Sequence, residues 1–277
     1  MYADINGLRM FYEIRGTSDP VKVPVVLLHG AISATGTSFG PLPDLLAQTR
    51  QVIAVEQQGH GRTADIDRPM SVQAMADDTL ALLASLGIGR ADLFGYSLGA
   101  GIALNIITNH PAVVRKAVLA SVTYDKTGLH PEMLGGPESG ESVDAPGRDL
   151  QIPFEQEYRA LAPDPGNWPA LLAKVQAMDL PEITPQAIAA INIPILLIIG
   201  DSDIVTPEHA VAMFRLLGGG VLGDLAPMPA TQFAVLPGTS HIGVTSRADM
   251  LMTMIPPFLD APYADSPCLR VPKLAGS

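Results

Sequence analysis

Short runs of consecutive apolar residues recur along the first half of the chain and alternate with amphipathic segments. Residues 23–28, 51–56 and 116–122 are β-branched and aliphatic runs, which are typical of strands buried on both faces. Residues 71–88 and 97–110 have the spacing of helices. This alternation predicts a parallel sheet covered by helices, with the functional residues at the carboxyl ends of its strands.

The helix predicted within 71–88 has one apolar face. Met75, Leu80, Leu83 and Leu86 fall on this face, whereas Ser71 marks the polar start of the helix and the Asp77-Asp78 pair its polar side. We therefore expect the apolar face to pack on a face of the sheet.

The two ends of the pattern and its interruption suggest the domain organisation. Near the start, Asn6-Gly7 joins two short alternating runs and predicts an antiparallel edge hairpin. The alternation stops after Val122, passes through a segment rich in Pro, Gly and Glu with two helical stretches, and resumes at Pro194. We predict a core of residues 1–122 and 193–262, a cap insertion of residues 123–192, and a loosely held tail of residues 263–277.

The composition narrows the class of protein. Hydrophobic residues make up 47% of the 277 positions and charged residues only 16%, which suits a large core. The net charge is −11 and the basic residues stand singly, so neither nucleic acid nor an anionic membrane surface is an expected partner. The expected partner is a small-molecule substrate, and the sequence does not indicate an oligomeric state.

The compartment is inferred from what the sequence lacks. The single cysteine, Cys268, can form no internal disulfide, and the first residues do not have the pattern of a signal peptide. The longest apolar runs are far shorter than the roughly 20 residues that span a bilayer. We therefore expect a cytoplasmic protein without a membrane segment.

The pattern G-x-S-x-G occurs twice, as GTSFG at 36–40 and as GYSLG at 95–99. A nucleophile elbow needs a strand, a sharp turn and then a helix. Ser97 has all three, because a buried strand precedes it and an amphipathic helix follows, which Gly101 is expected to let sit close to the sheet. Ser38 has no strand before it and is interpreted as a loop or helix-cap serine. Ser97 is therefore the expected nucleophile.

A serine hydroxyl needs a base, and the base needs a carboxylate that orients it. Among six histidines, His241 follows a predicted strand and should lie at the same sheet edge as Ser97. The segment after residues 194–200 offers Asp201 and Asp203, of which Asp203 is favoured because it lies farther past the strand. Asp125, after another strand, remains a reserve candidate.

The negative charge of a tetrahedral intermediate requires two N–H donors. Leu98, directly after Ser97, is expected to supply one, and Ala31, after the turn that Gly30 permits, the other. His29 is expected to brace this loop. We assign contact with substrate to Tyr96, His29 and Trp168.

These motifs resemble those of the α/β-hydrolase superfamily over nearly the whole chain, in that family's order of Ser, Asp and His. The matching segments are LLHGA at 27–31, EQQGHGRT at 56–63, GYSLGAGIAL at 95–104, GDSDIVTP at 200–207 and PGTSHIG at 237–243. The sequence departs from the family pattern at Glu56 and Gln58, where Asp and Arg are common, and in a long Gly-rich link at 218–230.

The resemblance implies an α/β-hydrolase fold, with a mostly parallel eight-stranded sheet, helices on both faces and a helical cap. It also implies a carboxylesterase that needs no metal or cofactor. Apolar residues of the cap suggest small to medium esters of low polarity: Met133, Leu134, Ile152, Phe154, Tyr158, Trp168, Leu171 and Leu172. The same triad would serve a lactonase, a cofactor-free perhydrolase or a carbon-carbon bond hydrolase. The alternative of another class is a ligand-binding receptor on a hydrolase fold.

Overall fold

A computed structural model describes residues 1–19, 21–133, 148–179 and 182–262, and the side chains of these ranges except 148–151. The predicted tail with Cys268 lies outside the described residues, as do residues 134–147 of the predicted cap, among them Leu134.

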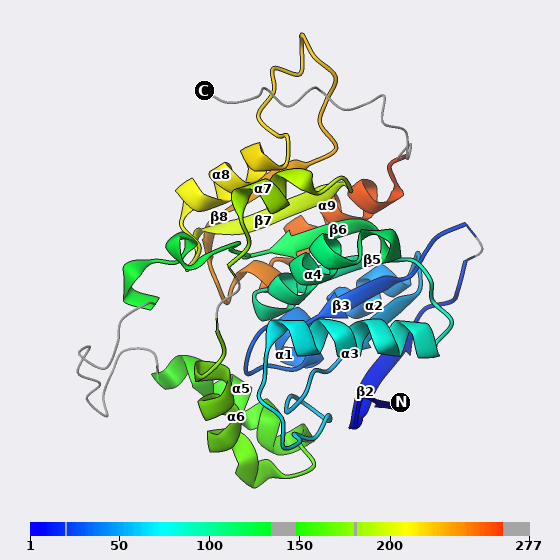
Figure 1. Cartoon of the computed structure of the whole chain (residues 1–277), viewed down its shortest axis with the longest axis vertical. Helices are drawn as coiled ribbons and strands as arrows, with labels where there is room; N and C mark the ends of the chain where they lie inside the picture. The colour runs from blue at the N-terminus through cyan, green and yellow to red at the C-terminus, as the bar shows by residue number, and fades with distance from the viewer. Residues whose placement is uncertain (20, 134–147, 180–181, 263–277) are drawn as a thin grey trace.

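The described strands form one eight-stranded sheet in the order β1-β2-β4-β3-β5-β6-β7-β8 (Figure 1). The pairs β1–β2 and β2–β4 are antiparallel, and every other pair is parallel. This confirms the predicted α/β class. The strands are β1 Tyr2–Ile5, β2 Leu8–Arg15, β3 Val25–Leu28, β4 Val52–Val55, β5 Ala91–Tyr96, β6 Val114–Ala120, β7 Ile195–Ser202 and β8 Gln232–Ser240.

The edge hairpin forms as its turn sequence predicts. Asn6 and Gly7 have φ angles of 48° and 85°, the left-handed values that a tight two-residue turn requires. Ile5 consequently pairs with Leu8, and β1 runs back along β2.

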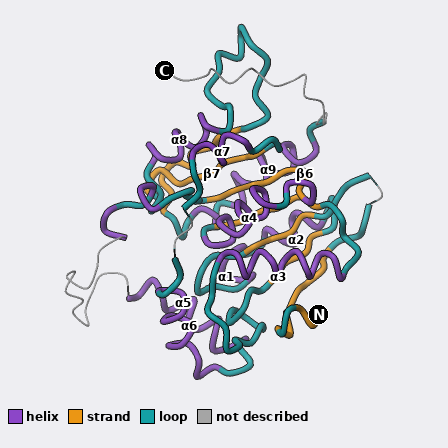
Figure 2. Tube along the Cα trace, viewed as in Figure 1, coloured by secondary structure: helices purple, strands orange, loops and turns teal. Residues whose placement is uncertain are grey.

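Helices cover both faces of the sheet (Figures 1 and 2). One face packs against α3 Val72–Ser85, α4 Leu98–Asn109, α7 Pro185–Ala190 and α8 Pro207–Leu216. The other packs against α1 Thr35–Phe39, α2 Leu42–Ala47 and α9 Ala248–Asp260. The remaining described helical turns are η1 Pro111–Val113, η2 Lys126–Gly128, η3 Pro131–Met133, η4 Pro165–Asn167 and η5 Val244–Ser246.

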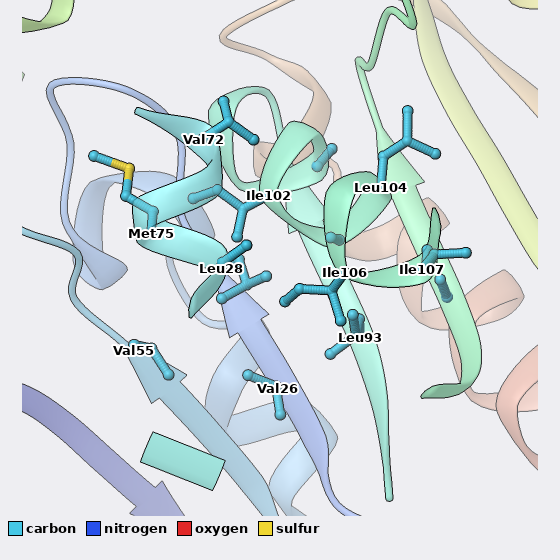
Figure 3. Close-up of a cluster of buried hydrophobic side chains, with 14 of the residues drawn as sticks. Val26, Leu28, Val55, Val72, Met75, Leu93, Ile102, Leu104, Ile106 and Ile107 are labelled. Atoms are coloured by element: carbon cyan, nitrogen blue, oxygen red, sulfur yellow. The ribbon is translucent and has the colours of Figure 1, made fainter. Parts of the chain in front are cut away.

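The core beneath α4 fixes the helix that follows Ser97. Ile102 and Ile106 of α4 point toward Val26, Leu28 and Leu93 of the sheet, and all five are fully buried (Figure 3). Burial of each such side chain contributes about 1.5–3 kcal/mol relative to exposure. The helix that starts after Ser97 is therefore held against the sheet by buried apolar contacts.

Helix α3 differs in one respect from its predicted face. Leu83 is buried, but Leu80 and Leu86 are only partly buried. Asp78, expected on the polar side, is fully buried because Arg68 pairs with it and Asn6 donates to it. A carboxylate with such partners can occupy a buried position that periodicity assigns to solvent.

The two helical stretches predicted in the cap are α5 Arg148–Leu161 and α6 Trp168–Gln176. They lie together beside α1, whereas α7 lies with α8 at the other end of the sheet (Figures 1 and 2). Among the described residues, no helix combines the length and apolar character needed to cross a membrane.

Candidate active site

Ser97 occupies a strained turn between β5, which ends at Tyr96, and α4, which begins at Leu98. Its φ of 54° and ψ of −118° are unusual for a residue with a side chain. The Ser97 N–H donates to Ala120 O at 2.9 Å, and its carbonyl accepts from Ala100 N at the start of α4. The turn thus holds the hydroxyl at the carboxyl end of a central strand.

Two glycines make this turn possible. A Cβ at Gly95 would overlap the carbonyl oxygen of Gly99, and a Cβ at Gly99 would overlap that of Leu28. The prediction that Gly101 is needed for close packing is wrong, because nothing beyond its own stretch of helix lies within 4 Å of where its Cβ would be. The close approach is made two residues earlier, at Gly99.

The structure brings together the three residues expected from sequence. Ser97 Oγ lies 3.0 Å from His241 Nε2, and His241 Nδ1 lies 2.7 Å from Asp203 Oδ1. The His241 side chain is 16% exposed and that of Asp203 is fully buried. These distances permit a proton to pass from the hydroxyl to the imidazole while the carboxylate fixes the ring.

Asp203 accepts further hydrogen bonds that hold it ionised. Ser121 Oγ donates to its Oδ2 at 2.6 Å, and Gly200 N donates to the same oxygen at 3.1 Å. Burial alone would raise the pKa of Asp203, but the hydrogen bond and charge of His241, with these two donors, hold that pKa below its usual value.

The other candidate carboxylates serve turns. Asp201 accepts from Gly238 N at 2.8 Å and Thr239 N at 3.0 Å, and these bonds lower its pKa. Asp125 caps η2 by accepting from Thr127 N at 2.8 Å. No hydrogen bond to His241 is recorded for either carboxylate among the described residues.

His29 and His60 are fully buried and lie beside one another, with ring centroids 5.0 Å apart. Gln57 N donates to His29 Nε2 at 3.0 Å, and Ile32 N donates to His60 Nε2 at 3.1 Å. Burial lowers the pKa of His29 to about 4 and that of His60 to about 3, so both rings are neutral near pH 7.

Of the two roles expected of His29, its contacts favour bracing the loop over touching substrate, because the ring is fully buried and Nδ1 lies 2.7 Å from Gly30 O. Trp168 is 5% exposed and packs on Tyr158, so it contributes chiefly to the packing of α6 on α5. Tyr96 lies closer to the triad, since its hydroxyl donates to His241 O at 2.9 Å.

The β3–α1 loop, residues 29–34, runs beside the start of α4. Ser38, expected in a loop or at a cap, lies buried inside α1, where its hydroxyl accepts from Gly30 N at 3.0 Å. Ser33 Oγ lies 2.6 Å from Ser38 Oγ and donates to Gly30 O. The GTSFG motif therefore supports this loop.

Helices α5 and α6 close over the same loop. Ile32, Ala34 and His60 face Phe154, Glu157, Tyr158 and Leu171, and the space between them is too narrow for a water molecule. The other lining residues are Ser33 and Gly61. In this conformation the contact between these two helices and the loop is closed.

The sequence of residues 25–252 matches the family model of the alpha/beta hydrolase family. The chain belongs to this family. It is 30% identical to a pimeloyl-acyl-carrier-protein methyl ester esterase of Neisseria meningitidis serogroup B over 222 residues, or 73% of this chain and 83% of that protein.

Two further likenesses are more limited. A Rhizobium rhizogenes protein that carries the name carbamate hydrolase RutD is 31% identical over 122 residues, which cover 44% of this chain and 46% of that protein. The enol-lactonase of Burkholderia xenovorans LB400 superposes with a TM-score of 0.69 over 94% of this chain and 100% of that one, at 19% identity. The second likeness shows the shared fold alone.

Two residues of this hydrolase's site region, Ser121 and Glu157, were not predicted from the sequence. Ser121 follows β6, a strand end that could have been searched for donors to Asp203. Glu157 lies on α5 and accepts from Ala34 N and Thr37 N. No local signal marks it. Within the described ranges, no three His, Cys, Asp or Glu side chains gather as a metal site would require.

Proposed function

We propose that this alpha/beta hydrolase cleaves small to medium carboxylic esters of low polarity through an acyl-enzyme. Ser97 is the nucleophile, His241 the general base and Asp203 the orienting acid. The observation that carries the proposal is the continuous contact from Ser97 Oγ through His241 to Asp203, at 3.0 and 2.7 Å, on a strained elbow.

The reaction follows from these contacts. His241 Nε2 takes the proton of Ser97 as Oγ attacks the ester carbonyl, and the imidazolium is stabilised by Asp203. The tetrahedral intermediate collapses when His241 returns that proton to the leaving alcohol. A water molecule then gives a proton to His241 and attacks the acyl-enzyme, and the acid is released as Ser97 recovers its proton.

We assign the oxyanion donors to the N–H groups of Leu98 and Ala31. Leu98 is the first residue of α4, so its N–H has no partner within the helix. In the β3–α1 loop, Gly30 N and Ile32 N are both engaged, whereas Ala31 N has no recorded partner among the described residues. A preorganised donor of this kind contributes about 3–4 kcal/mol to the stability of the transition state.

The substrate class rests on the cap and on the relatives. Where the cap meets the β3–α1 loop, the described lining is mostly apolar and its one charged side chain is Glu157, which would disfavour anionic acyl groups. The Neisseria relative is by name a methyl ester esterase. An uncharged ester is therefore the best-supported substrate.

The test is hydrolysis of p-nitrophenyl esters from acetate to laurate by the wild type, Ser97→Ala and Ser38→Ala at neutral pH. Ser97→Ala should lose at least about 10⁴-fold in kcat/KM. Ser38→Ala, which removes one anchor of the β3–α1 loop, should lose only about tenfold. The preferred acyl chain length would indicate the length of the acyl-binding pocket.

Two outcomes would overturn the proposal. Full activity in Ser97→Ala would show that Ser97 is not the nucleophile. Absence of any ester turnover by the wild type would show that the protein is not a simple esterase. A panel of lactones, peroxide with acetate, and carbon-carbon bond substrates then separates the other chemistries that the same triad supports. Saturable binding without turnover of any of them would indicate a receptor.

A further inference from the structure

The β3–α1 loop is fixed at three backbone N–H groups. Gly30 N donates to Ser38 Oγ at 3.0 Å, Ile32 N to His60 Nε2 at 3.1 Å, and Ala34 N to Glu157 Oε2 at 2.9 Å. Ala31 N, the donor assigned above to the oxyanion, lies between these anchored groups. Its direction is therefore set by all three anchors.

Glu157 differs from the other anchors in its origin. Ser38 and His60 belong to the core, but Glu157 is carried by α5 of the cap, 123 residues away from Ala34 along the chain. Its second oxygen, Oε1, accepts from Thr37 N at 2.8 Å in α1. A carboxylate shared between two N–H donors forms charge-assisted bonds, which are stronger than those between neutral groups.

Gly36 provides the room for this contact. A Cβ at Gly36 would lie 2.5 Å from Glu157 Oε1, so any larger residue would displace the carboxylate. The end of a flexible side chain can move aside, and the fold itself would not be strained. The first glycine of the GTSFG motif thus has a specific role, although the motif holds no nucleophile.

The cap also shuts the space beside the loop. Phe154, Tyr158 and Leu171 meet Ile32 across a gap too narrow for a water molecule. A substrate that enters between cap and core must part these surfaces, and the Glu157 bonds lie on the same interface. Docking of the cap and anchoring of Ala34 consequently occur together.

We propose that Glu157 is a positioning residue that completes the oxyanion site only when the cap is docked, by holding Ala34 and thereby directing Ala31 N–H at the tetrahedral intermediate. This inference rests on the proposed ester hydrolysis at Ser97. Its physical basis is that a donor stabilises the transition state only if it is held in place before charge develops.

The test compares Glu157→Ala, Glu157→Gln and Gly36→Ala, which disturb the same contact from its two sides. The matched controls are Glu155→Gln, on the same helix but paired with Arg159, and Gly89→Ala, around which there is open space. For each variant, kcat and KM are measured on the best ester, together with the melting temperature. Inhibition is measured with a trifluoromethyl ketone, which forms an oxyanion on Ser97, and with the matched alcohol, which does not.

Glu157→Ala and Gly36→Ala should lower kcat about tenfold, with a smaller change in KM. The inhibition constant of the trifluoromethyl ketone should rise by the same factor, while that of the alcohol stays within about threefold. The kcat of Glu157→Gln should lie between that of Glu157→Ala and that of the wild type. Its amide keeps one oxygen as an acceptor for the two N–H donors. Both controls should match the wild type.

Unchanged kcat in Glu157→Ala would overturn the inference. Equal weakening of ketone and alcohol with a lower melting temperature would also overturn it, since that pattern indicates general support of the cap. Failure of the proposed function looks different. In that case the wild type itself would not hydrolyse esters, and a fluorophosphonate would not label Ser97, which would refute both proposals together.

Discussion

Ser121 Oγ lies 2.6 Å from Asp203 Oδ2, the carboxylate oxygen that faces away from His241. Ser121 follows β6 with a positive φ of 57°, a conformation that is costly for a residue with a side chain. Gly200 N donates to the same oxygen at 3.1 Å. Two donors on Oδ2 leave Oδ1 aimed at the imidazole, so this strained turn fixes the orientation of the acid.

Ser121→Ala should lower kcat/KM by about tenfold, the cost of losing one hydrogen bond to a charged group. Because the bond contributes to the low pKa of Asp203, its loss should raise that pKa and move the acid limb of the rate profile to higher pH. The measurement is kcat/KM for an ester from pH 4 to 8. Ser202→Ala, at an exposed neighbouring position, is the control, and identical profiles for all three proteins would contradict the expectation.

Asp203→Asn should reduce kcat by roughly 10⁴-fold, because an amide disfavours the imidazole tautomer that accepts the proton of Ser97. Asp201→Asn should retain nearly full activity, since Asp201 accepts hydrogen bonds from Ser202 and from backbone N–H groups at the end of β8 and, in the part of the chain that the structure describes, none from His241. Ester turnover of the two variants is compared after their far-ultraviolet circular dichroism is matched. If Asp201→Asn were the inactive protein, the acid would have been assigned to the wrong residue.

The sequence was sufficient for residues that local pattern identifies. Ser97, Asp203 and His241 each follow a strand-like run, and parallel strands bring their carboxyl ends to one edge of the sheet. Their meeting could therefore be predicted without any knowledge of distances. Even the choice of Asp203 over Asp201 depended only on how far each residue lies past the strand.

Residues whose role depends on a distant partner could not be predicted. Glu157 meets Thr37 across 120 positions and Ser121 meets Asp203 across 82, and neither contact leaves a repeat or spacing to detect. His29 was given two possible roles, and only its burial separates them. The error at Gly101 has the same origin, because the sequence shows where a glycine stands but not what lies opposite.

Gly99→Ala should prevent stable folding, whereas Gly101→Ala on the same helix should stabilise the protein. A methyl group at Gly99 would overlap the carbonyl oxygen of Leu28, so the helix or β3 must shift, at a cost of several kcal/mol. At Gly101 there is open space, and alanine in a helix interior is favoured over glycine by about 1 kcal/mol.

Both glycine variants are compared by soluble yield and by urea unfolding. A Gly99→Ala protein as stable as the wild type would mean that α4 does not need to approach β3 so closely. A destabilised Gly101→Ala protein would mean that this face of α4 is covered in solution.

Glu56→Gln should change how stability depends on pH. Glu56 is fully buried, and burial raises its pKa to about 7 even though Arg62 donates to both of its oxygens. In the unfolded chain the pKa of a glutamate is about 4.3. Between these two values the folded protein holds a proton that the unfolded chain has released, so the free energy of unfolding falls as pH rises. Well above pH 7 Glu56 is ionised in both states, so it no longer makes the free energy of unfolding depend on pH.

Glutamine carries no such proton, and the variant should lack this contribution. The free energy of unfolding of the wild type minus that of Glu56→Gln should therefore fall by on the order of 3 kcal/mol between pH 4.5 and 7.5. Urea unfolding at half-unit intervals measures this difference, and Glu132→Gln at the surface serves as the control. A difference that stays flat across the range would mean that Glu56 is ionised in the folded protein, with the Arg62 ion pair outweighing the cost of burial.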